Sequence, residues 1–154
     1  MFRLRYMLFF LLSVLLFADK VEITSDAMKA EEAKKEVHFI GNVKIVQNES
    51  WIHGDHVVVY FDENNQTKRY DASGSVRFEF KNEEHFYKGS ADRVTYEPLE
   101  SKYILRGKAA IDDVINKRHI NGEHIELDLV SGLANVAGSK KEPVKFIFET
   151  EEIK

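Results

Sequence analysis

The sequence predicts an all-β domain of antiparallel strands that bend at regular intervals. Two observations support this: an acidic residue followed by a glycine recurs four times, and apolar and polar residues alternate around each glycine. The acids are Asp26, Asp55, Asp92 and Glu123, and the glycines are Gly41, Gly74, Gly107 and Gly138. The glycine lies 15 residues after the acid in three units and 19 in the second, and successive glycines are 31 to 33 residues apart. A repeat of this length indicates copies of one supersecondary unit.

The N-terminus is expected to be an export signal over residues 1–18, followed by one folded domain over 19–154. Two arginines precede an apolar run over 6–17, which ends at the small Ala18. This order is typical of a secretory signal peptide. A retained membrane anchor is the alternative, but the 12 residues of this run are fewer than the roughly 20 that a spanning helix needs. We therefore favour cleavage.

The charge balance argues against nucleic acid as the main partner. From residue 19 onward the chain has 20 basic and 26 acidic residues, a net charge of −6, and an acidic surface repels phosphate backbones. The chain has no cysteine. An exported domain without disulfides has to be stabilised by its own core and backbone hydrogen bonds.

Strands are expected on both sides of each glycine, because apolar residues recur there with period two. Around Gly74 the apolar positions are Tyr70, Ala72, Val76, Phe78 and Phe80. Turn-forming residues fall at 47–50, 62–67, 81–84, 97–100 and 130–132, where hairpins need them. Residues 28–35 are rich in Ala, Glu and Lys, so local propensity favours a short helical turn there, whereas the repeat favours a hairpin.

The apolar face shifts register at each acidic residue. Val57 lies five positions after Ile52, and because this spacing is odd, a regular strand would place the two side chains on opposite faces. A bulge or bend at Gly54-Asp55 resolves this conflict. The acids Asp26, Asp55, Asp92 and Glu123 are therefore predicted to mark structural corners and to accept backbone N–H hydrogen bonds there. A parallel β-helix and an open antiparallel roll both fit, and the hairpin turns favour the roll.

The motifs resemble those of the OstA-like/LptA family of lipopolysaccharide transport proteins. The matching stretches are Ile-Thr-Ser-Asp at 23–26, Phe-x-Gly-Asn-Val at 39–43, Ile-His-Gly-Asp at 52–55 and Gly-Ser-Ala-Asp at 89–92. The resemblance implies a β-jellyroll of about sixteen antiparallel strands, open along one side. It also implies binding of lipid A in the periplasm, and docking end to end with like folds on inner-membrane and outer-membrane partners. Two features depart from the pattern: Gly138 is followed by Ser139 and two lysines, and the second unit has four extra residues.

Given this resemblance, the apolar faces are predicted to line a lipid-binding groove. The groove residues are Phe39, Val43, Ile45, Ile52, Val57, Val59, Val76, Phe78, Val94, Tyr96, Leu105, Ile111, Ile120, Ile125, Leu127, Phe146 and Phe148. An acyl chain of a dozen methylenes costs roughly 10 kcal/mol to hold in water, at ~0.8 kcal/mol per methylene, so a carrier has to shield it. The alternative is that these residues form only the core, and we expect them to do both.

The two ends of the sheet are expected to expose unpaired strands. The last strand is predicted at 144–148, entered through Pro143, and the first at 21–23. Edge strands pair with other chains, which predicts a head-to-tail homo-oligomer. The alternative is that the acidic residues after 148 protect the edge by charge.

The sequence predicts no catalytic residue, no metal site and no cofactor. The four acids recur in equivalent settings, whereas a catalytic pair needs two different environments. His53 and His56 lie near each other, but no third ligand accompanies them. Five basic residues could meet lipid phosphates at the groove rim, with ordinary surface charge as the alternative: Lys44, Arg77, Lys108, Lys117 and Arg118.

Three other interpretations stay open on the sequence alone: a membrane-anchored partner domain of the same pathway, a β-scaffold that binds only protein, and a carbohydrate-active β-helix enzyme. Asn65 also stands in an extended N-glycosylation acceptor motif, Glu63-x-Asn65-x-Thr67, whose use depends on a host enzyme.

Overall fold

The protein is described here by a computed structural model that defines residues 20–151. The predicted export signal at 1–18 lies outside the described residues. The strands are β1 (Val21–Thr24), β2 (Ala27–Glu31), β3 (Glu36–Gln47), β4 (Ser50–Phe61), β5 (Thr67–Lys81), β6 (Phe86–Glu97), β7 (Lys102–Asp113), β8 (Arg118–Asp128), β9 (Ala134–Ala137) and β10 (Lys145–Phe148). Over the described part of the chain, the fold contains no helix with the length and hydrophobicity that a membrane span requires.

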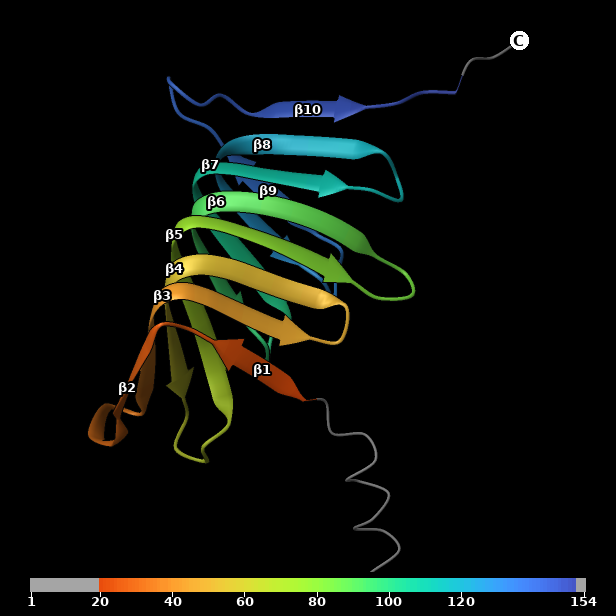
Figure 1. The fold of residues 1–154 in the computed structure, drawn as a ribbon. Coiled ribbons are helices and arrows are strands. Elements are labelled where there is room, and N and C mark those ends of the chain that lie inside the picture. The colour runs from red at the N-terminus through yellow and green to blue at the C-terminus, as the bar shows by residue number, and fades with distance from the viewer. Residues whose placement is uncertain (1–19, 152–154) are drawn as a thin grey trace, which may run out of the picture.

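All strands join one antiparallel sheet in the order β1-β3-β4-β5-β6-β7-β8-β10, with β2 also paired to β3 and β9 also paired to β8. The strands β1 and β2 pair with opposite halves of β3, and β10 and β9 pair with opposite halves of β8. The strands β1 and β2 together, and likewise β9 and β10 together, therefore occupy the place of one long strand that is interrupted at its middle. The result is eight bent strands, or sixteen half-strands, which confirms the predicted all-β, open antiparallel jellyroll (Figure 1).

The long strands bend together where β3, β5 and β7 each carry a bulge in the middle. The pairs Gly41-Asn42, Gly74-Ser75 and Gly107-Lys108 have φ values near 80° and 47°, in the left-handed region. At these pairs the register of β3 shifts relative to β4, and the registers of β5 and β7 shift relative to both neighbouring strands. The bend predicted at Gly54-Asp55 is found there, since the register shifts between His53 and His56, but the extra residue lies on the facing strand β5. The glycine-containing strand carries the extra residue, because glycine adopts a positive φ without strain.

The bends divide the sheet into two arms. We call them the β1–β10 arm and the β2–β9 arm, after the short strands that belong to each. Figure 1 shows the long strands turning together along one side, from which the two arms diverge. Because side chains alternate along each strand, every long strand contributes one apolar face to the space between the arms.

Connections follow the predicted turns with two additions. Residues 28–35 form both of the expected structures: β2 pairs with β3 as a hairpin, and a 3-10 turn at Glu32–Lys34 connects them. The connections over 114–117 and 138–144 were not predicted. The first lacks glycine and proline, and the second lies where the repeat is degraded.

The core lies between the arms near the bend. Its largest fully buried side chains are aliphatic: Leu105, Ile125, Val43, Val57, Val76 and Val94. These side chains project from both arms close to the bulges, where the backbone itself holds the arms together. The interior is therefore most deeply buried near the bend, and less buried residues lie farther from the bend.

Candidate functional site

The inner face of each arm carries a row of apolar side chains that crosses every bent strand. On the β2–β9 arm, cross-strand pairing aligns Met28, Phe39, Val57, Ala72, Val94, Leu105, Ile125 and Val136. On the β1–β10 arm it aligns Ile23, Ile45, Ile52, Phe78, Gly89, Ile111, Ile120 and Phe146. Neither row contains a charged residue, so the interior presents an apolar lining from one end of the sheet to the other.

Most of the predicted groove residues gather in this interior. Fifteen of the seventeen belong to one apolar cluster, either buried or packed against its buried members. The exceptions are Phe146 and Phe148 in β10, which are 51% and 57% exposed and stack on each other with ring centroids 5.4 Å apart. Their exposure follows from the position of β10 at the end of the sheet, where no further strand covers them.

Several aromatic residues of the lining were not among the predicted groove residues. Tyr70, Phe80, Tyr87 and Tyr103 all belong to the interior cluster. Three of them occupy apolar positions of the period-two pattern around Gly74 and Gly107, so the same alternation could have identified them. A tyrosine ring suits such a lining because, like phenylalanine, it buries a large apolar surface.

These aromatic rings form one connected group that reaches from arm to arm. On the β2–β9 arm, Tyr96 stacks on Tyr70 at 5.9 Å and on Tyr103 at 4.4 Å between centroids. Tyr103 then contacts two rings of the β1–β10 arm, Phe78 at 5.6 Å and Phe80 at 6.1 Å. Burial raises the pKa of the Tyr103 hydroxyl, and neighbouring Tyr96 adds to this effect. The hydroxyl therefore stays neutral at physiological pH, which keeps this part of the interior uncharged.

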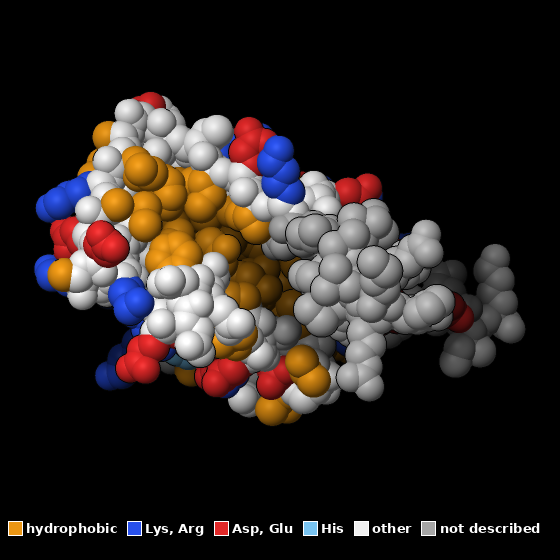
Figure 2. All heavy atoms as spheres, turned by 90° about the horizontal axis from the view of Figure 1, so that it is seen from below, with side chains coloured by type: hydrophobic (Ala, Val, Ile, Leu, Met, Phe, Trp, Pro, Cys, Tyr) orange, Lys and Arg blue, Asp and Glu red, His pale blue; other side chains and the backbone are white. Residues whose placement is uncertain are grey.

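Two cavities lie on either side of the aromatic group. One, of about 40 Å³, is near the N-terminal end of the sheet and is lined by Val21, Ile45, Trp51, Ile52, Tyr96 and Tyr103, among others. The other, of about 170 Å³, is near the C-terminal end and is lined by Tyr87, Ile111, Ile120, Leu127, Ala134 and Phe146, among others. Figure 2 views the molecule from below Figure 1 and shows hydrophobic side chains lining a hollow at the N-terminal end of the sheet. Between the two cavities the molecule's own side chains fill the interior.

The C-terminal cavity carries one ion pair at its edge. Arg118 Nη2 lies 2.7 Å from Asp113 Oδ2, and Asn116 Nδ2 donates to the same carboxylate oxygen at 2.9 Å. Burial alone would raise the pKa of Asp113, but the hydrogen bonds from Arg118 and Asn116 outweigh it and hold this pKa below its usual range. Of the five predicted rim cations, Arg118 is thus committed to a carboxylate. Lys44, Arg77, Lys108 and Lys117 are all exposed.

The corner acids pack against the bulge glycines. A methyl group added at Gly41, Gly74 or Gly107 would overlap the carboxylate of Asp26, Asp55 or Asp92, respectively. Hydrogen bonding at the first corner differs from the prediction: the Asp26 backbone N–H donates to the Gly41 carbonyl at 2.8 Å. The Asp26 carboxylate accepts from the Asn42 side chain at 3.3 Å. The fourth unit departs from the pattern, since Gly138 has Val144, Glu142 and Pro143 as neighbours.

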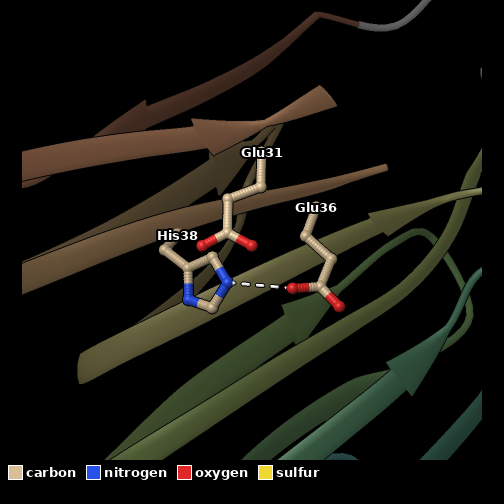
Figure 3. A group of neighbouring side chains, drawn as sticks. All are labelled: Glu31, Glu36 and His38. Atoms are coloured by element: carbon tan, nitrogen blue, oxygen red, sulfur yellow. Dashed lines mark hydrogen bonds and ion pairs between the residues drawn. The ribbon is translucent and has the colours of Figure 1, made fainter. Parts of the chain in front are cut away.

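One group of metal-ligand type lies on the outer side of β2 and β3. Ligand-type atoms of Glu31, Glu36 and His38 are within 4.8 Å of one another, and Figure 3 shows both carboxylates near the His38 ring. The group already has partners of its own. Glu31 pairs with Lys29 at 3.1 Å and Lys34 at 3.3 Å, and these hydrogen bonds lower its pKa.

His53 and His56 were grouped from the sequence, but in the structure His56 lies next to His38. His38 Nε2 lies 3.0 Å from Glu36 Oε2, and its Nδ1 lies 3.3 Å from His56 Nε2. His56 therefore has His38 as its neighbour across the strands, whereas the sequence had suggested His53. The absence of a metal site stays a prediction.

Two arms of bent antiparallel strands around a largely apolar interior define an open β-jellyroll. The family model described as "LptA/(LptD N-terminal domain) LPS transport protein" matches residues 22–133. The chain therefore belongs to this family of lipopolysaccharide transport proteins, as its motifs had indicated.

Comparison of structures agrees on the fold. The chain is similar to a crystal structure of LptH from Pseudomonas aeruginosa, described as the LptA homologous periplasmic component of the lipopolysaccharide transport device. The TM-score is 0.75 at 15% sequence identity, covering 85% of this chain and 96% of LptH. A search of the curated proteins gave no match.

Proposed function

We propose that this protein is a periplasmic carrier that shields the acyl chains of lipopolysaccharide between its two arms. The observation that carries the proposal is the pair of uncharged apolar rows that cross all eight bent strands. An acyl chain that lies on such a surface is removed from water, which stabilises it by ~0.8 kcal/mol of free energy per buried methylene. This hydrophobic stabilisation is non-directional. Weak directionality suits a carrier, because its cargo also has to leave.

The proposal extends to the position of the protein between the membranes. A chain exported by the signal at 1–18, with a mature form starting near Asp19, would be free in the periplasm. The similarity to LptH, itself a periplasmic component, supports this. Intact-mass measurement of the native protein tests it: loss of the first 18 residues supports a free bridge. A full-length mass would favour the membrane-anchored partner domain instead.

A photoreactive residue tests the lipid site directly. We would place p-benzoylphenylalanine at Ile111, which lines the C-terminal cavity, and in a matched variant at Asp112, the next residue, which is exposed. We expect ultraviolet crosslinks to lipopolysaccharide from position 111 and far fewer from position 112. Equal yields from both positions would show that lipid does not enter between the arms and would favour a scaffold that binds only protein.

We further propose that the two ends of the sheet dock head to tail with like folds, in other copies and in the inner-membrane and outer-membrane partners. The strand β10 is exposed along its whole length and pairs with β8 on one side. The strands β1 and β2 form the opposite end of the sheet and are also mostly exposed. Pairing of one end with the other would continue both the backbone ladder and the apolar rows.

Truncation tests the docking proposal. A chain ending at Pro143 lacks β10, whereas a chain ending at Phe148 keeps β10 and loses only residues 149–154, which include three glutamates. We expect the intact chain and the longer truncation to grow in mass with concentration in light scattering, and the shorter one to stay monomeric. If the intact chain is monomeric from micromolar to millimolar concentration, the docking proposal is wrong.

A further inference from the structure

We propose that Tyr103, with Phe78 and Phe80, forms a gate between the arms that has to open before an acyl chain can extend from one cavity to the other. This inference rests on the proposed carrier function. It adds a step that the apolar lining does not by itself imply, because it assigns particular side chains to control the continuity of the groove.

The position of these rings relative to the bends places them across the interior from each other. Tyr103 lies four residues before the Gly107 bulge, on the β2–β9 arm, and Phe78 lies four residues after the Gly74 bulge, on the β1–β10 arm. The two side chains therefore project into the interior at a similar distance from the bend. Their rings stack with an interplanar angle of 13°, and Phe80 meets Tyr103 at 63°, edge to face.

The same rings stand between the two cavities. Tyr103 lines the N-terminal cavity, and Tyr87 lines the C-terminal one. The Phe80 ring packs against both tyrosine rings, with its centroid 6.1 Å from that of Tyr103 and 6.5 Å from that of Tyr87. A chain of stacked rings thus separates the cavities, and no acyl chain can run between them while these contacts hold.

These contacts differ from those of the core near the bend. At the bulges the arms are continuous through the backbone, but the strand halves that carry Phe78 and Tyr103 hydrogen-bond only to neighbours within their own arms. Side-chain packing alone therefore joins the arms at this distance from the bend. An acyl chain offers apolar contact in exchange for that packing, so opening with lipid present exposes little apolar surface to water.

Gly89 provides space for one of the rings. In the row on the β1–β10 arm it is the one member without a side chain, and the ring of Phe78 fills the volume that a Cβ at Gly89 would need. Movement of the Phe78 ring would therefore leave a gap in the lining about as wide as one side chain, next to Ile111 on the following strand. This gap lies on the direct line between the cavities.

Removing a gate ring should strengthen lipid binding, whereas loss of a lining ring that does not bridge the arms should not. We would compare Tyr103→Ala with Tyr96→Ala, because Tyr96 stacks on Tyr103 but contacts no ring of the opposite arm among the described residues. Each ring pair across the arms corresponds to a factor of about two to ten in an equilibrium constant. We therefore expect Tyr103→Ala to bind purified lipid A about tenfold more tightly than the wild type, and Tyr96→Ala to bind it no more tightly.

Phe80→Ala serves the same test if Tyr103→Ala does not fold, since Phe80 is only half-buried. Unchanged or weaker lipid A binding by the folded gate variants, to the same extent as by Tyr96→Ala, would overturn the gate. If the wild type also fails to bind lipid A, the carrier function fails with it, so the two failures can be told apart.

A reversible lock provides the opposite perturbation. Because the chain has no cysteine, Phe80→Cys with Tyr103→Cys creates the only two thiols, which a short bis-methanethiosulfonate reagent can join across the arms. The control pair, Lys44→Cys with His53→Cys, joins neighbouring strands on the outer side of one arm. We expect the lock to reduce lipid A binding at least tenfold and a reductant to restore it, with no such change in the control. Equal binding with the gate pair locked and reduced would overturn the proposal.

Discussion

The packing of a corner acid on a bulge glycine can be tested at Gly107. This residue has a φ of +80°, and a methyl group at its Cα would overlap the carboxylate of Asp92. An alanine in the left-handed region costs about 1–2 kcal/mol, and overpacking in a position without free space costs about 1–3 kcal/mol more. Gly107→Ala should therefore lower the free energy of unfolding by about 2–5 kcal/mol.

Gly132 provides a matched control for the backbone contribution alone. Its φ of +71° also lies in the left-handed region, but no atom is within 4 Å of the position that its Cβ would take. Gly132→Ala should thus lose only the conformational part, about 1–2 kcal/mol. Urea denaturation of both variants at low protein concentration measures the difference, and dilution prevents assembly from raising the apparent stability.

A double-mutant cycle separates the steric contribution. In the Asp92→Ala background the overlapping carboxylate is absent, so Gly107→Ala should cost about as much as Gly132→Ala. The reasoning would be refuted if Gly107→Ala cost no more than Gly132→Ala in the wild-type background. It would also be refuted if Asp92→Ala left the cost of Gly107→Ala unchanged.

Three further predictions concern the core, an outer ion pair and the rim of the C-terminal cavity. Leu105→Ala should lower the unfolding free energy by about 2–5 kcal/mol in urea denaturation, because Leu105 is 0% exposed and its removal leaves a cavity. Arg93→Ala should cost about 1–3 kcal/mol in the same assay, because it leaves Asp71, which is 8% exposed, without its guanidinium partner. Arg118→Gln should change the acid profile. The lowered pKa of Asp113 contributes stability that is present above its unfolded value of about 3.8 and is lost as the pH falls through the folded value. The wild type should therefore exceed Arg118→Gln in stability most above pH 4, and the gap should narrow at lower pH; a gap that widens there would contradict the assignment.

The sequence by itself determined the class of fold and the positions of the bends. Period-two alternation identified the strand faces because side chains of a strand point to opposite sides in turn. The recurrent acid motifs located the bends, since the apolar face changes register there. The structure then showed that the facing glycines, such as Gly74 with its positive φ, lie in the bulges. The same alternation placed residues such as Val57 and Leu105 inside, and the motifs at 23–26 and 39–43 indicated the family.

Only the tertiary structure decided which inner residues meet across the arms. Tyr103 and Phe78 are 25 residues apart in the chain and lie on strands that do not pair with each other. No local pattern can encode their contact, because it depends on the angle between the arms and on the register of the intervening strand. The same holds for the exposure of Phe146, which its apolar sequence pattern could not reveal. Apolar alternation indicates that a side chain faces inward, but only the order of the strands in the sheet shows whether another strand covers that side chain.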